Sequence, residues 1–330
     1  MRWFVLFSFV MLALGCAPGK SPGPSSSTSP KADFKVALLT PGPVSDAGWS
    51  AMAYEGLQAI KTEMSAEVSN QQASSSAEIR DAMRSYAQKD YDLVFGHGYE
   101  YNAPAMEIGK DFPNTVFVSS SGDKAAGNVG TFRFYLEQGF YLAGMMAAEM
   151  SKTGKIAMIG GPDVPSIRST FEAFKAGARA AKPGIGLIET FTGSGDDVAK
   201  AKLATLAAIN AGADFVIHQA NAAAQGVFDA CKERKVYAFG ANLNQNENAS
   251  GVVIASAVIN ARPAFLDLAK RVKDGSFKGE VILMGMDKEA IDFLVNPALQ
   301  NLVPEPLLAK LMDTKAKLRA GEIKAPMAKF

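Results

Sequence analysis

The sequence predicts an α/β protein with two lobes of one plan, each built on a parallel sheet covered by helices. From Phe34 onward, short apolar runs alternate with amphipathic segments. This alternation is typical of parallel sheets with helices on both faces. Two pairs of strand-like segments also repeat: 35–39 resembles 155–159, and 92–95 resembles 214–217. The nearly equal offsets indicate two related lobes, whose strand ends face each other across a cleft.

The individual elements follow from local patterns. The first strand ends at Pro41-Gly42-Pro43, and apolar residues from Trp49 to Met64 then recur at helical spacing. Ser75 and Glu78 form a capping box that predicts the start of a second helix. We also predict strands at 93–95 and 115–118 and helices at 135–152 and 165–182.

The composition and net charge of the chain exclude several classes of function. The chain has 330 residues, 48% hydrophobic and 20% charged, with a formal charge of +1. This is globular composition, and a nearly neutral chain lacks the basic surface that nucleic-acid binding needs. Two cysteines, Cys16 and Cys231, cannot form a disulfide framework or a four-thiolate zinc site. We therefore predict no metal, no cofactor and no nucleic-acid partner.

The N-terminus predicts export. An apolar run from Trp3 to Leu14 follows Arg2 and is too short to span a bilayer, so residues 1–15 are interpreted as a signal peptide. The run ends at Ala13-Leu14-Gly15-Cys16, which resembles a lipobox with Ala13 in place of the usual leucine. An ordinary secretory signal with an incidental cysteine is the alternative. Residues 16–33 are rich in Pro and Ser and predict a disordered tether. We expect a lipid anchor at Cys16 that holds the protein on the bacterial cell envelope, facing the periplasm or the exterior.

Enzyme signatures are weak. Ser121–Lys124 fits S-x-x-K and Lys152–Gly154 fits K-T-G, but the two lie too close in sequence for a penicillin-recognising enzyme. The chain contains no G-x-x-x-x-G-K-[ST] and no H-E-x-x-H. The sequence therefore predicts a binding protein rather than an enzyme.

Polar and aromatic residues cluster where the predicted strands end. Trp49 offers a face for stacking on a flat ring, and Asp46 a carboxylate acceptor; in the alternative interpretation Asp46 caps a helix and Trp49 lies in the core. Arg133 is expected to pair with either a ligand or Glu137. The predicted ligand contacts are Asp46, Trp49, His97, Gly98, Tyr99, Ser119, Ser120, Phe134, His218, Gln219, Asn221 and Asn242.

These features together resemble the basic membrane protein (BMP), or PnrA-like, lipoproteins, which are solute-binding components of ABC importers. The segments that carry the resemblance are 42–49, 128–134, 137–144, 154–161, 212–214 and 321–326. The resemblance implies a type I periplasmic-binding-protein fold, with two Rossmann-like lobes joined by three crossings. We expect residues 34–130 and 258–284 to form lobe 1, and residues 131–257 and 285–330 to form lobe 2, with either lobe open to the C-terminal helix from Pro304. It also implies a purine nucleoside or nucleobase ligand held between aromatic rings, and an ABC permease as partner.

The chain departs from the family pattern at the expected ribose contacts. Ser119–Ser121 and Asn242 stand where nucleoside binders carry aspartates, and Ile259 where they carry a lysine. We therefore expect a free purine base or a nucleoside-like flat molecule as the ligand. We also expect a monomer that closes its hinge on that molecule. Two alternatives are a different, bulkier ligand and a surface receptor that feeds a signalling system.

Overall fold

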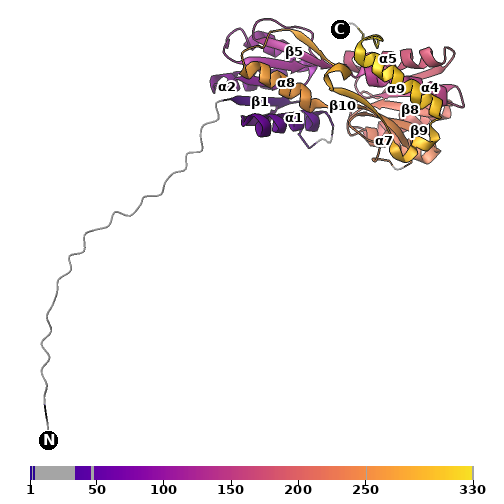
Figure 1. Ribbon diagram of the computed structural model, residues 1–330, viewed down its shortest axis with the longest axis horizontal. Coiled ribbons are helices and arrows are strands. Elements are labelled where there is room, and N and C mark those ends of the chain that lie inside the picture. The colour runs from indigo at the N-terminus through magenta and orange to yellow at the C-terminus, as the bar shows by residue number, and fades with distance from the viewer. Residues whose placement is uncertain (2, 4–33, 46–47, 250, 329–330) are drawn as a thin grey trace. The chain divides into compact units, whose positions relative to one another are not determined.

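Two six-stranded sheets organise the chain into two lobes (Figure 1). The protein is described from a computed structural model that defines residues 1, 3, 34–45, 48–249 and 251–328. Residues from Ala32 onward form one unit. Cys16, Asp46, the predicted tether and the predicted signal peptide apart from Met1 and Trp3 lie outside the described residues.

The first sheet has the strand order β11-β5-β4-β3-β1-β2, and all its strands are parallel. Its strands are β1 (Lys35–Thr40), β2 (Glu67–Gln72), β3 (Leu93–Gly96), β4 (Val116–Ser120), β5 (Val129–Phe134) and β11 (Val281–Met284).

The second sheet has the matching order β12-β10-β9-β8-β6-β7. Its strands are β6 (Lys155–Gly160), β7 (Gly186–Phe191), β8 (Phe215–Gln219), β9 (Tyr237–Asn242), β10 (Val253–Ile259) and β12 (Ile291–Val295). Only β12 runs antiparallel to its neighbour among these strands. The match of β1 with β6 and of β3 with β8 confirms the repeat predicted from the sequence.

Helices cover both faces of each sheet. In the first lobe these are α1 (Trp49–Met64), α2 (Ser76–Gln88), α3 (Asn102–Ile108) and α8 (Ala261–Lys273), and in the second α4 (Glu137–Met150), α5 (Pro165–Ala181), α6 (Val198–Asn210), α7 (Ala224–Arg234) and α9 (Glu305–Ala320). Short 3₁₀ helices span Tyr99–Tyr101, Met286–Lys288 and Pro297–Leu302. The helices predicted at 135–152 and 165–182 are confirmed as α4 and α5, and the Ser75–Glu78 capping box is present at α2.

Alternating side chains on the strands explain the layers. On β1, Val36 and Leu38 join the apolar cluster under α1 and α8, while Ala37 and Leu39 join the cluster under α2 and α3. In the second lobe, Gly144 and Gly177 allow α4 and α5 to pack closely, since a side chain at either position would clash with the backbone of the other helix. No helix among the described residues is long and apolar enough to cross a bilayer.

The lobes are joined at three places: residues 135–136 after β5, residue 260 after β10, and residues 285–290 after β11. The predicted boundaries at 130 and 258 fall inside β5 and β10. Strand pairing assigns all of β5 to the first sheet and all of β10 to the second. The sequence did not reveal these boundaries because an apolar strand has the same composition up to its last residue.

The C-terminal helix belongs to the second lobe. Lys310 of α9 pairs with Glu149 of α4 at 2.7 Å. Beyond α9 the chain returns to the first crossing, where the Tyr135 hydroxyl donates to the Ala325 carbonyl. The backbone amide of Ala328 donates to Ser169 Oγ at 2.9 Å. The segment that carries Ala325 and Ala328 therefore lies beside the hinge.

Candidate functional site

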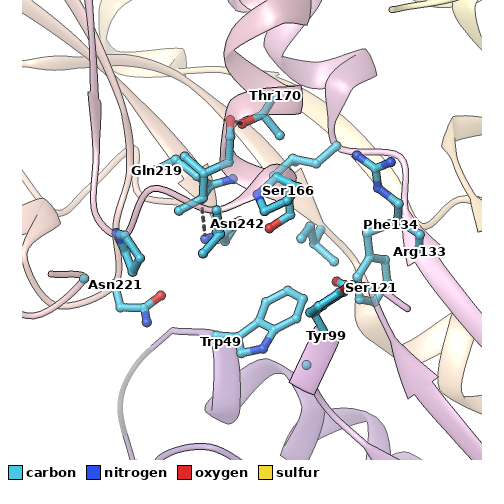
Figure 2. Close-up of a pocket in the computed structure, with 18 of the residues that line it drawn as sticks. Trp49, Tyr99, Ser121, Arg133, Phe134, Ser166, Thr170, Gln219, Asn221 and Asn242 are labelled. Carbon is cyan, nitrogen blue, oxygen red and sulfur yellow. Dashed lines mark hydrogen bonds between the residues drawn. The ribbon is translucent and has the colours of Figure 1, made fainter. Parts of the chain in front are cut away.

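A cavity of about 440 Å³ lies where the carboxyl ends of both sheets meet (Figure 2). Parallel α/β sheets bind ligands at this edge. The first lobe contributes Pro41, Trp49, Gly98, Tyr99, Ser121 and Phe134, and the second contributes Ser166, Thr170, Gly195, Gln219, Asn221 and Asn242. Because both lobes line the same space, a molecule bound there contacts both.

Trp49 is a stacking platform with one face already occupied. It is the first residue of α1 and is half-buried. The His97 ring stacks on the indole at 3.9 Å between centroids and 22° between planes, and Phe134 meets it edge-on at 6.3 Å. Since Trp49 also lines the cavity, the indole face opposite His97 is the one left for a flat ring.

Hydrogen bonds fix the orientation of this platform. Trp49 Nε1 donates to the His97 carbonyl at 3.1 Å. His97 Nε2 lies 3.0 Å from the Trp49 carbonyl, which requires a proton on Nε2, so that Nδ1 accepts from Ser120 Oγ at 3.1 Å. The two residues thus lock each other in place, and the indole plane is set before any ligand arrives.

The second lobe supplies a wall of uncharged amides. Asn242 Nδ2 donates to Gln219 Oε1 at 3.0 Å, the contact dashed in Figure 2. This bond leaves the Gln219 amide N–H groups as donors and Asn242 Oδ1 as an acceptor. Asn221 also lines the cavity. Donors and acceptors without net charge suit the edge of a neutral heterocycle.

His218 lies behind this wall. It is fully buried within β8, its Nε2 donates to Gln245 Oε1 at 2.8 Å, and its Nδ1 accepts from the Ala220 amide at 3.3 Å. Burial lowers the pKa of His218 to about 4, so the ring is neutral near pH 7. Gln245 Oε1 also accepts from the Ala241 amide at 2.9 Å. His218 therefore holds the backbone that presents Gln219 and Asn242.

The structure divides the predicted contact residues into two groups. Those that line the cavity are Trp49, Gly98, Tyr99, Phe134, Gln219, Asn221 and Asn242. The residues that do not line it are His97, Ser119, Ser120 and His218, all of them buried. Ser119 Oγ instead accepts from Asn102 Nδ2 at 2.9 Å. Asp46 lies outside the described residues. In this structure His97 and Ser120 hold the Trp49 platform, and only His218 lies behind the amide wall of the second lobe.

Arg133 pairs with Glu137 rather than standing open to a ligand. The guanidinium donates to Glu137 Oε1 and, at 3.0 Å, to Ser169 Oγ, which itself donates to Glu137 Oε1 at 2.5 Å. Burial raises the pKa of Glu137, while the Arg133 charge acts against that rise. Both residues also line the cavity, so a buried ion pair spans the hinge at the edge of the site.

Sequence reasoning missed the start of α5. Pro162, Val164, Ser166, Ile167 and Thr170 all line the cavity. This segment follows β6 as the Trp49 segment follows β1, so the predicted repeat carried the signal. Ile259, which stands at the expected lysine position, lines the cavity as well. Among the described residues, no three His, Cys, Asp or Glu side chains gather in a way that holds a metal ion.

Two matching lobes, a three-part hinge and a cavity shared between them define a two-lobed solute-binding protein of the type I periplasmic-binding-protein fold. The chain belongs to the Bmp family, described as PnrA-like ABC-transporter substrate-binding proteins, whose profile matches residues 34–327.

Curated relatives span the whole body of the chain. A purine-binding protein of Brucella abortus is 27% identical over 88% of this chain and 82% of its own length. The nucleoside-binding protein BmpA of Lactococcus lactis is 28% identical, covering 84% and 86%. The transcriptional activator protein med of Bacillus subtilis is 28% identical, covering 98% of each.

Solved structures share the fold. A solute-binding protein of Aeropyrum pernix K1 matches with a TM-score of 0.78 and 19% identity, covering 89% of this chain and 94% of that one. One from Conexibacter woesei matches at 0.72 with 24% identity, covering 89% and 98%.

Proposed function

We propose that this substrate-binding protein captures a purine base, or a flat nucleoside-like molecule, between its lobes and delivers it to an ABC permease. The observation that carries the proposal is the pairing of one free indole face, from Trp49, with the uncharged amide wall of Gln219 and Asn242 on the opposite lobe. A purine offers a flat ring for the first and a rim of donors and acceptors for the second.

Cavity size and charge agree with such a ligand. About 440 Å³ falls within the roughly 300–1,000 Å³ of small-molecule sites. The cation of Arg133 is already paired with Glu137, which disfavours a free phosphate or carboxylate. The names of the Brucella and Lactococcus relatives, purine-binding and nucleoside-binding, support the same class.

Hinge closure supplies the mechanism. A ligand that contacts both lobes stabilises the closed arrangement over the open one by the contacts it makes only when the lobes meet. The permease then distinguishes loaded from empty protein by shape. The match to a family of substrate-binding proteins supports binding without turnover.

The proposal includes the cell-envelope location. Cleavage before Cys16 and lipidation of that cysteine would anchor the body outside the cytoplasm through residues 16–33. Expression of the native chain and of a Cys16→Ser variant tests this: the native protein is expected in the membrane fraction with the mass of an acylated cysteine. Equal recovery of both proteins in the soluble fraction would contradict an anchor.

Two measurements test the ligand class. Denaturing the purified protein and analysing the released small molecules by mass spectrometry should yield a purine. Titration calorimetry with adenine, hypoxanthine, adenosine and ribose should show binding of at least one purine compound and none of ribose. Release of a sugar or lipid, together with flat titrations for every purine, would overturn the proposal.

A second candidate is ligand sensing. It is favoured by the Bacillus subtilis relative, named a transcriptional activator. The same cleft and hinge serve a sensor, whose closed form meets a signalling partner instead of a permease. Deletion of the gene that encodes the protein distinguishes the two functions. If the protein serves an importer, the cells lose uptake of labelled purine; if it is a sensor, they keep uptake and lose a transcriptional response.

A further inference from the structure

Glu137 carries an oxygen that the protein leaves unmatched beside the cavity. It is the first residue of α4, directly after the first crossing, and its side chain is 1% exposed. Oε1 accepts from both Arg133 and Ser169. Oε2 is buried and has no hydrogen-bond partner among the described residues, although Glu137 lines the cavity.

Such an oxygen is costly to bury. An unsatisfied buried acceptor costs about 1–3 kcal/mol, and more when it belongs to a charged group. Two other buried carboxylate oxygens without a hydrogen bond, on Glu189 and Asp267, lie in ion pairs with Lys175 and Arg271. Glu137 also has a cation beside it, but Arg133 approaches the other oxygen. Oε2 therefore shares the ion pair only through the other oxygen of its carboxylate, and it has no hydrogen bond of its own while its residue borders the site.

The surrounding charges restrict what Oε2 accepts. Both donors to Oε1 fit an ionised carboxylate, and its place in the first turn of α4 favours negative charge. A ligand ammonium would meet the guanidinium of Arg133 close by, and a ligand anion would meet the carboxylate itself. A neutral N–H donor satisfies the oxygen without either repulsion.

We propose that Oε2 of Glu137 accepts a hydrogen bond from the neutral exocyclic amino group of the ligand, so that the site selects amino-bearing purines over their oxo counterparts. This inference rests on the proposed function and deepens it by naming the class of purine. The acceptor also directly follows the first crossing, so the contact ties recognition of the amino group to the hinge.

The test compares two bases of the same shape. Adenine carries an amino group where hypoxanthine carries an oxo group. The native protein is expected to bind adenine at least tenfold more tightly. Glu137→Gln keeps the size of the side chain but presents an N–H where Oε2 stood, while its oxygen still accepts from Arg133 and Ser169. The adenine-to-hypoxanthine affinity ratio should fall at least tenfold in this variant.

Ser169→Ala is the matched control. It removes one donor to Oε1 and leaves Oε2 unchanged, so the affinity ratio should stay within about twofold of the native value even if both affinities drop. A purely structural role for Glu137 would weaken both bases together. A native preference below tenfold, or a ratio that Glu137→Gln lowers by less than tenfold, overturns the inference.

A structure of the native protein with adenine gives a second measurement, which needs no variant to fold. The amino nitrogen of adenine about 2.7–3.2 Å from Oε2 supports the inference, and a ring nitrogen, a water or an apolar atom there overturns it. Failure of the proposed function is a separate result. If neither base binds the native protein, both proposals fall; if bases bind and Oε2 is not used, only this one does.

Discussion

Ser121 and Asn242 occupy matching positions in the two lobes and share an unusual backbone conformation. Ser121 directly follows β4 and Asn242 ends β9, the corresponding strand of the second sheet. Their φ angles are 63° and 68°, in the left-handed region that costs an L-residue about 1–2 kcal/mol. Both line the cavity. Strained residues of this kind cluster at functional sites, and here the strain recurs by symmetry at the rim of the cleft.

Asn242 provides a test that separates strain from recognition. Asn242→Gly and Asn242→Ala both lose the amide that bonds to Gln219, but only alanine keeps a Cβ in the left-handed region. Both variants should bind purine more weakly, by about 0.5–1.5 kcal/mol. In urea unfolding, the alanine variant should be about 1 kcal/mol less stable than the glycine variant. Equal stability of the two would argue against strain at this position.

The Trp49 platform predicts a graded loss of affinity. Trp49→Ala removes the stacking face and should weaken purine binding by about 1–3 kcal/mol. Trp49→Phe keeps an aromatic face and loses the indole bond to the His97 carbonyl, so its affinity should fall between the native and alanine values. Calorimetric titration with one purine checks the order. Native affinity in the alanine variant would remove Trp49 from the site.

The buried His218 predicts loss of stability in acid. Its pKa is lowered from 6.5 to about 4 by burial, so between these values the unfolded chain holds more protons than the folded one. Stability from this group is therefore complete above about pH 6.5 and is lost as the pH falls toward 4, by up to about 3 kcal/mol. Urea unfolding at pH 7 and pH 5 checks the direction. Glutamine at this position has no proton to gain, so His218→Gln should show a smaller pH effect; an unchanged effect would point to other groups.

The segment after Gly321 is expected to contribute to the stability of the fold at the hinge. Truncation after Gly321 removes the contacts of Ala325 with Tyr135 and of Ala328 with Ser169. The loss of these hydrogen bonds, of those that the Glu322 and Ile323 amides donate to the Lys317 carbonyl, and of a buried alanine should lower the free energy of unfolding by about 1–3 kcal/mol. Tyr135→Phe removes one of these bonds and should cost about 0.5–1.5 kcal/mol. Thermal unfolding of the truncated chain at the native midpoint would show that the segment is not needed.

Local patterns were enough to predict most of the fold. The strand at Lys35 and its counterpart at Lys155 are both apolar runs that end at glycine or proline, and burial on both faces explains their composition. The capping box at Ser75 is a contact between near neighbours in sequence, which local reading detects.

The site was harder to predict from the sequence. Packing between segments distant in sequence decides which side chains at a strand end face the cavity. His97 and His218 stand at the expected edge, but the first is covered by Trp49 and the second by the loop that carries Gln245. The missed start of α5 is a different case. The internal repeat makes the segment around Ser166 and Thr170 the counterpart of the Trp49 segment, so the sequence contained this signal.

An odd number of crossings places the two ends of the body in different lobes. β1 begins the first sheet, whereas α9 closes the second. Residues before Phe34 therefore connect directly to the lobe that carries Trp49, and the lobe that carries Gln219 and Asn242 is connected to them only through the three crossings.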